Sequence, residues 1–531
     1  MSKFTKPFAL KTALACAVSL GALASFSAHA KPFRWATQGD ILTMDPHAQN
    51  EGLNNTASSF IYEPLINYND KFQLEPSLAL SWSKESNLLW KLKLRPNVKF
   101  HDGTPFTADD VVFSIERVMA ATSNFKIYAT GIQGSKAIDP LTVVIYTNSP
   151  NPVLLRQLTE IRIMSRAWSE KNKVPKPQDY VNKEETFAVR NANGTGPYIL
   201  KAREPDVRTT FVENTAWWGK SSKRGNVSEV IYSPIKSAAT RTAALLSGEV
   251  DFVIDPPSQD LERLKASAKV LEGEENRTIF IGMDQSRDEL TSGNIKGKNP
   301  FKDVRVRQAL YQAIDIEAIK KSVMRGGALP TGTMISPQVH GWSKEIDARL
   351  PHSEARAREL LTQAGYPTGF EFTLDCPNNR YINDESICQA VIAMWARIGV
   401  KAKLNAMPRA VYFAKVQKFE TSAYLLGWGV PTFDALYSIQ SLIRTVGQGG
   451  DGNFNLGRYS NAKIDALVDV IKVETDEKKR DAAITEVLKL HAADVGHIPL
   501  HNQVIPWAMR KNISVNHRAD NRLDMRNVRV E

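Results

Sequence analysis

The chain has 531 residues, of which 42% are hydrophobic and 24% are charged, so it is long enough to bury several cores. Its net charge of +11 is spread along the sequence. Because the sequence has no long basic block and no aromatic–basic repeat, we expect no nucleic-acid partner. It also has no internal repeat or obvious linker, so we expect the domains to interleave along the chain.

Residues 1–30 have the pattern of a secretory signal peptide. Three lysines come first, an apolar run from Thr12 to Phe26 follows, and an Ala-His-Ala cleavage motif ends at Ala30. The apolar run is too short to span a bilayer. We therefore expect cleavage and a periplasmic mature protein. Cys16 raises the alternative of a lipoprotein, but it lies inside the apolar run, where a lipid-bearing cysteine fits poorly.

The first half of the mature chain predicts a mixed α/β region. A segment rich in strand-forming residues, Trp82 to Phe100, ends at a turn that begins with His101. A helix is expected after it, with Thr107 as its N-cap. Alternating or continuous apolar residues predict short strands at 33–38, 140–147, 198–201, 209–213 and 249–254.

From about Ile279 the pattern changes to helices that alternate with short strands. Two helices are expected within 304–325, with a break near Asp315, and the region 461–494 reads as helical. A strand that begins at His497 is expected to return toward the first region.

A strand–helix–strand unit lies in the middle of this second region. Residues 370–375 alternate as a strand does, and a second alternating run begins at Val400. The helix between them is predicted by one apolar face, made of Ile387, Ala390, Val391, Met394, Trp395 and Ile398. Such a unit implies two parallel strands, and the apolar run 423–428 predicts a further strand.

Two loops follow the carboxyl ends of these strands, where open α/β sheets bind their ligands. We expect an arginine, a tryptophan and an aspartate from these loops to converge on a small organic ligand. The alternative is that the arginine pairs with a surface carboxylate and the tryptophan belongs to the core. The candidate ligand-binding residues of the two loops are Asn378, Arg380, Tyr381, Trp428, Thr432 and Asp434.

Cys376 and Cys388 are the two cysteines that remain after processing. In an oxidising compartment such a pair indicates either a disulfide or two buried thiols, and both interpretations stay open. We find no catalytic or phosphate-binding motif and predict no cofactor and no enzymatic activity. His491, His497 and His501 are close in sequence, but at the start of a strand we expect structural histidines and no metal.

Several motifs together resemble the family-5 solute-binding proteins of bacterial ABC importers, the dipeptide- and oligopeptide-binding proteins. The most specific match runs from Trp90 to Val111 and includes the His-Asp-Gly turn. Supporting motifs are Met44-Asp-Pro-His47, Ile61-Tyr-Glu-Pro-Leu65, Gly194-Thr-Gly-Pro-Tyr198, Leu246-Ser-Gly-Glu-Val-Asp251, Phe301-Lys-Asp-Val-Arg-Val-Arg-Gln-Ala309 and Gly427-Trp428.

This resemblance implies an α/β, two-lobed periplasmic binding protein fold of type II, cluster C-like, with an extra subdomain in lobe one. It places lobe one at 31–272, lobe two at 273–504 and a C-terminal tail that returns to lobe one at 505–531. It also adds His47 to the candidate ligand-binding residues. The implied partners are a ligand held between the lobes and an inner-membrane ABC permease, with the protein acting as a monomer.

The resemblance implies a small peptide or peptide-like ligand, with two departures from the peptide-binding pattern. Pro431 occupies the position of the acid that holds the peptide amine, which leaves Asp434 as the nearest carboxylate. Asn378 aligns with the arginine that holds the peptide carboxylate, and Arg380 lies two residues further on. The alternative ligand is a non-peptide solute, such as a metal chelate, a glycoside or another organic acid.

Overall fold

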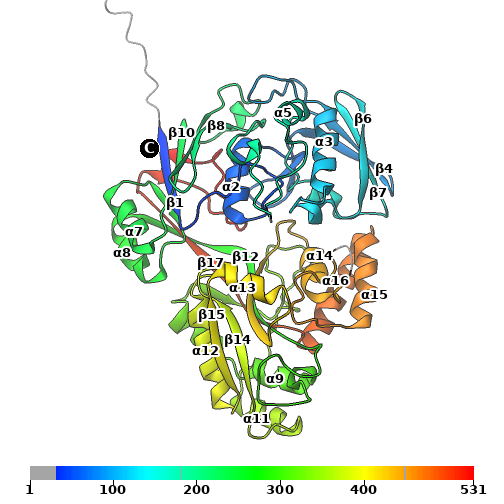
Figure 1. Cartoon of the computed structure of the whole chain (residues 1–531), viewed down its shortest axis with the longest axis vertical. Helices are drawn as coiled ribbons and strands as arrows, with labels where there is room; N and C mark the ends of the chain where they lie inside the picture. Colours follow the sequence, from blue (N-terminus) through cyan, green and yellow to red (C-terminus); the bar gives the residue numbers. More distant parts are fainter. Residues whose placement is uncertain (1–30, 181, 448–449) are drawn as a thin grey trace, which may run out of the picture.

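The computed structural model describes residues 31–180, 182–447 and 450–531. The predicted signal peptide, 1–30, therefore lies outside the described residues. Figure 1 shows two lobes joined by the long strands β12 (Lys269–Met283) and β17 (Ile498–Met509). Within the described part of the chain, no helix is both long and apolar enough to cross a membrane.

One sheet runs through both lobes. Its strand order is β15-β14-β16-β12-β17-β11-β1-β10-β9-β8, and β13 also pairs with β17. The pairs β1–β10, β1–β11, β14–β15 and β14–β16 are parallel. The parallel pair β14–β15 confirms the sequence prediction for the strand–helix–strand unit. The remaining strands of this sheet are β1 (Pro32–Thr37), β8 (Tyr198–Glu204), β9 (Arg208–Glu213), β10 (Glu229–Pro234), β11 (Phe252–Ile254), β13 (Ala328–Pro330), β14 (Glu371–Pro377), β15 (Lys401–Met407) and β16 (Ala423–Gly429).

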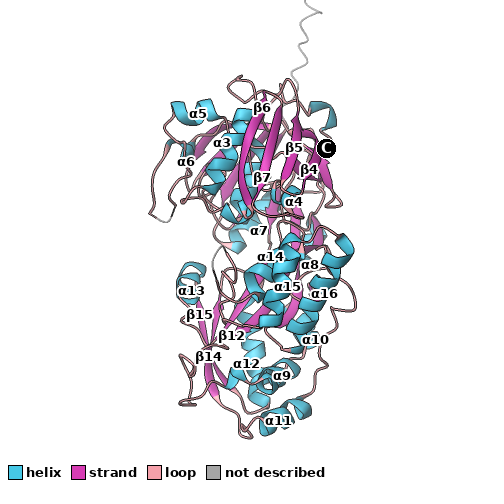
Figure 2. Cartoon of the chain, turned by 90° about the vertical axis from the view of Figure 1, so that its right-hand side faces the viewer, coloured by secondary structure: helices cyan, strands magenta, loops and turns pink. Residues whose placement is uncertain are grey.

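Lobe one, at the top of Figure 1, carries a second, antiparallel sheet that forms the extra subdomain (Figure 2). Its order is β4 (Ala79–Ser86), β5 (Leu89–Leu94), β7 (Thr142–Thr147) and β6 (Ile132–Asp139). Helix α3 (Ala108–Met119) buries Val111, Ile115 and Val118 against it. Thr107 is the N-cap, as predicted, and its backbone N–H donates to the Asp110 carboxylate at 2.9 Å.

The other elements of lobe one are shorter. They are α2 (Gly52–Ile61), β2 (Ile66–Tyr68), β3 (Leu74–Pro76), α4 (Leu154–Gln157), α5 (Arg166–Lys171), α6 (Phe187–Arg190), α7 (Ala238–Ser247) and α8 (Leu261–Ser267). The end of the chain packs on this lobe through β18 (Ile513–Ser514) and β19 (Arg529–Val530). The Lys31 ammonium donates to the Val530 carbonyl at 2.9 Å, which ties the end of the chain to its described start.

Lobe two contains the predicted strand–helix–strand unit. Helix α12 (Asp384–Arg397) connects β14 to β15 and buries Ile387, Val391 and Trp395. Gly399 follows it with φ +88°, in the left-handed region that favours glycine after a helix. The other helices are α9 (Val304–Gln312), α10 (Ile316–Ala318), α11 (Glu354–Gln363), α13 (Arg409–Val416), α14 (Ala435–Ser438), α15 (Ala462–Val473) and α16 (Glu477–Ala493), with π-helical turns at Ile319–Val323 and Ile439–Ile443.

The region 461–494 is helical, as predicted. It is divided into two helices, because Asp476 accepts a hydrogen bond from the Lys479 N–H and begins α16. Helix α13 was not predicted.

The predicted lobe boundaries, 272/273 and 504/505, fall inside β12 and β17, where Gly273 pairs with Ile505. The division at these residues stays a prediction.

Candidate ligand-binding cavity

A cavity of about 1080 Å³ lies between the two lobes. Lobe one contributes the start of α2 and the segment around residues 123–131, and β12 contributes Glu275–Arg277. Lobe two contributes the loop after β14, helix α13 and the end of β16. Its lining includes Glu51, Lys126, Tyr128, Glu275, Arg277, Arg380, Tyr381, Arg409, Trp428, Pro431, Tyr437, Phe454, Asp520 and Arg522.

Arg380 lies in the loop between β14 and α12, as the sequence predicts, and lines this cavity. The backbone N–H groups of Arg380 and Tyr381 donate to the Asp384 carboxylate at 2.9 and 3.0 Å, which holds the loop against the start of α12. The guanidinium carbon lies 5.0 Å from the centre of the Tyr381 ring. Among the described residues it has no ion-pair partner. Burial, and then the charge of Arg277, lower the pKa of Arg380.

Trp428 stands at the end of β16 and contributes to a row of aromatic rings, here called the aromatic wall: Tyr128, Tyr437, Trp428 and Phe454. Trp428 stacks on Tyr437 at 5.3 Å, and Tyr437 stacks on Tyr128 of lobe one at 6.2 Å. Phe454 lies 4.8 Å from Trp428. The Trp428 indole N–H has no hydrogen-bond partner among the described residues. Trp428 therefore belongs to the core of lobe two and also faces the cavity.

Asp434 does not line the cavity, contrary to the predicted convergence. Its carboxylate forms two hydrogen bonds with the buried guanidinium of Arg480, at 2.6 and 2.9 Å, and caps α14 at the Leu436 N–H. Burial alone would raise the pKa of Asp434, but the charge of Arg480 holds it well below its ordinary value. The reason for the different placement is that Arg480, on α16, is buried and requires an anion.

Three other predicted residues also lie outside the cavity. The Thr432 carbonyl accepts from the Tyr68 hydroxyl at 2.6 Å, and Asn378 is exposed at the surface. His47 is fully buried, where its Nε2–H donates to the Arg162 carbonyl at 2.9 Å and its Nδ1 accepts from Arg117 at 3.1 Å. Burial, with the charge of Arg117, lowers the pKa of His47 to about 3.

Several charged residues of the cavity come from segments that the sequence did not single out. Arg409 on α13 forms an ion pair with Glu51 of lobe one at 3.2 Å, and Arg277 pairs with Glu275 at 2.9 Å. Asp520 pairs with Arg518 at 2.8 Å. Within the described part of the lining, every carboxylate is therefore paired, whereas the Arg380 guanidinium is not. Only the N-cap position of Glu51 before α2 leaves a sequence signal, and it does not indicate ligand binding.

The two cysteines form a disulfide, with a distance of 2.01 Å between the sulfur atoms. It links the end of β14 to α12 on either side of the Arg380 loop, and the alternative of free thiols is wrong. His491 and His497 are buried and hydrogen-bonded to each other at 2.9 Å. Across the described residues, these histidines and His501 do not form a cluster of three metal ligands.

Comparison with known proteins agrees with this architecture. Residues 73–450 match the bacterial extracellular solute-binding proteins, family 5. The chain is 27% identical to heme-binding protein A of Haemophilus influenzae over 505 residues, which cover 90% of this chain and 86% of the relative. It is 28% identical to the glutathione-binding protein GsiB of Pectobacterium atrosepticum over 502 residues, 90% and 91% of the two chains.

Among solved structures, the periplasmic binding protein DppA from Helicobacter pylori, in complex with the peptide STSA, is 22% identical. It superposes with a TM-score of 0.77 over 94% of this chain and 98% of the other. The chain has the two-lobed fold of the type II periplasmic binding proteins and belongs to family 5 of the bacterial extracellular solute-binding proteins.

Proposed function

We propose that this protein is the periplasmic, monomeric substrate-binding component of an ABC importer for a carboxylate-bearing organic solute, such as a small peptide or peptide-like compound. The ligand is held between the lobes, and the closed form delivers it to an inner-membrane permease. The protein binds without chemistry. Cleavage of residues 1–30 releases it into the periplasm.

Arg380 is the observation that carries this proposal. It is the arginine of the cavity whose guanidinium has no ion-pair partner within the described part of the chain, and its neighbours Arg277 and Arg409 add positive charge. A ligand carboxylate would form a bidentate pair with it and offset the cost of its burial. Heme and glutathione, named for two relatives, both carry carboxylates.

The rest of the lining favours a ligand with a planar or apolar part. The aromatic wall supplies ring faces against which such a part of the ligand packs. The cavity volume is at the upper end of small-molecule pockets, which are roughly 300–1,000 Å³. The ligand touches both lobes in this arrangement, which selects the closed form over the open one.

The amino end of a peptide has no ready partner in this cavity. Glu51, Glu275 and Asp520 are each paired with an arginine, and Asp434 is held by Arg480. A free α-ammonium group would have to displace one of these arginines. A ligand with a blocked amine, or a non-peptide organic acid, therefore fits the lining better than a simple dipeptide does.

Native mass spectrometry of the mature protein, purified from periplasm without ligand exchange, tests the proposal. One or several bound masses that fragment as carboxylic acids would support it, and a distribution of peptide masses would narrow it to peptides. A bound neutral or cationic compound without a carboxylate would overturn it.

A further inference from the structure

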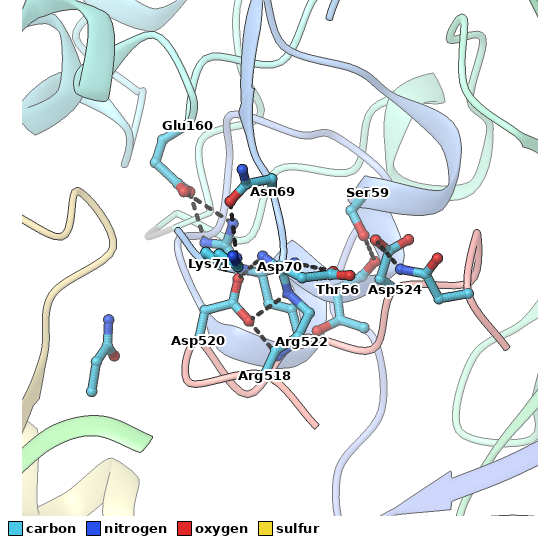
Figure 3. A network of polar contacts seen from close by, with 12 residues as sticks. Thr56, Ser59, Asn69, Asp70, Lys71, Glu160, Arg518, Asp520, Arg522 and Asp524 are labelled. Carbon is cyan, nitrogen blue, oxygen red and sulfur yellow. Dashed lines mark hydrogen bonds and ion pairs between the residues drawn. The ribbon is translucent and has the colours of Figure 1, made fainter. Parts of the chain in front are cut away.

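A second, smaller cavity of about 70 Å³ lies inside lobe one, beneath the C-terminal tail. Figure 3 shows the polar network around it, in which tail residues face residues of the first half of the chain. Arg522 forms a bidentate pair with Glu160 at 2.7 and 3.0 Å. Asp520 and Arg522 line both this cavity and the ligand-binding cavity, so they form part of the wall between the two.

The carboxylates that line the small cavity already have partners. Asp520 pairs with Arg518 at 2.8 Å, and Asp524 pairs with Arg526 at 2.8 Å. Glu63 accepts hydrogen bonds from the indole N–H groups of Trp217 and Trp218, at 3.0 and 2.8 Å. It also accepts one from the hydroxyl of Thr195 at 2.8 Å.

Arg162 also lines this cavity but, unlike the carboxylates, has no partner for its charged group among the described residues. Only 7% of its surface is exposed, and within the described chain its guanidinium has neither a hydrogen bond nor an ion pair. Burial lowers the pKa of Arg162 to about 10. The charged groups that act on it are Glu160, Arg522, Arg526 and Glu63, and all of them line the same cavity. Its guanidinium therefore faces this space.

We infer that this cavity binds a small inorganic anion, a halide or a tetrahedral oxyanion, through the guanidinium of Arg162. A buried arginine without a paired anion is costly, and the neighbouring carboxylates are engaged elsewhere. One buried water needs roughly 10–15 Å³ of cavity space, so a volume of about 70 Å³ has room for several waters or for one small anion. It is far smaller than the ligand-binding cavity of about 1080 Å³.

Crystals of the full mature protein soaked in bromide, and others soaked in selenate, test the site directly. We expect an anomalous peak from at least one of these anions within hydrogen-bond distance of the Arg162 guanidinium. Ordered water alone in this cavity in both kinds of crystal, with the anions bound elsewhere, would overturn the inference. This measurement uses the wild-type protein, so it does not depend on whether an Arg162 variant folds.

Thermal unfolding supplies the second test and identifies the anion. We expect the wild-type Tm to rise by about 2 °C when gluconate, which is too large for the cavity, is replaced by chloride, sulfate or phosphate at equal ionic strength. A rise with the oxyanions alone indicates a tetrahedral ion, and a rise with chloride indicates a halide. Sulfate also stabilises proteins by exclusion from their surface, so the readout is the difference between wild type and Arg162→Met.

Arg162→Met should lose the part of the Tm rise that comes from anion binding, whereas Arg208→Met, at an exposed arginine of the same lobe, should show the same rise as the wild type. Equal responses of wild type and Arg162→Met to every anion would contradict the inference.

Discussion

The two residues that the sequence paired as ligand contacts, Arg380 and Asp434, differ in what already surrounds them. The Asp434 carboxylate holds the buried guanidinium of Arg480, so a ligand amine would have to break that pair. Arg380 has no such partner in the described chain and lines the cavity beside Tyr381. A ligand carboxylate can therefore form an ion pair with Arg380 without breaking an existing ion pair. A ligand amine could not do so at Asp434.

At the residue scale, we expect Arg380→Ala and Trp428→Ala each to weaken ligand binding by about 1–3 kcal/mol, the loss typical of a central contact residue. This corresponds to roughly a 5- to 150-fold rise in Kd. Isothermal titration with the co-purified ligand measures it. Arg208→Ala serves as the control, and wild-type affinity in both cavity variants would show that the site is assigned wrongly.

Asp434→Asn should lower the stability of the protein without weakening ligand binding. Removing the charge leaves Arg480 buried without an anion, so we expect the free energy of unfolding to fall by about 3 kcal/mol. Ligand affinity should stay near the wild-type value, because Asp434 does not line the cavity. Urea unfolding and titration of the same preparation separate the two effects. A large loss of affinity in the folded variant would mean that Asp434 contacts the ligand.

His340 makes one contribution to stability depend on pH. Its ring lies 3.4 Å from Asp434 and 3.3 Å from Asp481. These carboxylates raise the pKa of His340, and Asp434 has the largest effect, whereas burial and the charge of Arg156 oppose the rise. Because the pKa of His340 is raised in the folded protein, the stabilisation by its protonated ring is complete below about pH 6.5, the ordinary pKa in the unfolded chain. This stabilisation is lost as the pH rises through the pKa of His340 in the folded protein. The difference in unfolding free energy between wild type and His340→Gln should therefore shrink from pH 6 toward pH 9. A difference that grows with pH would contradict this.

At the scale of elements, the cavity depends on the junction between β14 and α12. The disulfide joins these elements, and Asp384 at the first turn of α12 accepts the N–H groups of Arg380 and Tyr381. The loop that carries Arg380 is thus held at its base by a covalent bond and along its length by hydrogen bonds. Its position is set by its neighbours before any ligand arrives.

Removing the disulfide should cost about 2–4 kcal/mol of unfolding free energy, since it closes a short loop in the unfolded chain. The double variant Cys376→Ser, Cys388→Ser measures this by urea unfolding, and a thiol assay of the unfolded wild type should find no free thiol in the mature chain. We also expect a several-fold loss of ligand affinity, because the Arg380 loop loses its covalent support. Wild-type stability in the variant would contradict the expectation.

At the scale of the whole molecule, the lobes meet at aromatic contacts outside the cavity, here called the inter-lobe clasp and made of Tyr68, Phe72 and Phe433. Phe72 stacks on Phe433 at 4.1 Å, and the Tyr68 hydroxyl donates to the Thr432 carbonyl across the same junction. Phe72 and Phe433 have φ values of +57° and +50°, in the left-handed region that a bulky residue rarely adopts. Such strain persists only where surrounding contacts impose it.

Phe433→Ala should shift the molecule toward the open form, because it removes inter-lobe packing while leaving the cavity lining unchanged. We expect a larger radius of gyration by small-angle scattering without ligand and a roughly 5- to 10-fold weaker Kd, which reflects a smaller closed population. Phe187→Ala, at an exposed phenylalanine of lobe one, is the matched control. An unchanged radius and Kd in Phe433→Ala would show that the clasp does not favour closure.

Local patterns were enough to predict several elements. The apolar face of α12, the alternation in β14 and β15, and the Thr107 cap of α3 all appear where the sequence places them. They were predictable because each depends on residues within one or two turns or strands. The position of Arg380 at the cavity follows from the same rule, since a loop after a parallel strand lies at the edge where ligands bind.

The partners of the charged groups were decided by tertiary structure alone. Asp434 meets Arg480 across 46 residues of sequence, and Glu51 meets Arg409 across 358. No periodicity links such distant positions, so the sequence could not show that Asp434 pairs with Arg480. For this reason the expectation that Asp434 lies at the cavity differs from its position in the structure. The sequence by itself determined the family, the main elements and the Arg380 loop. The fold decided which charges are already neutralised, because buried charges are paired by whatever the packing of distant segments brings beside them.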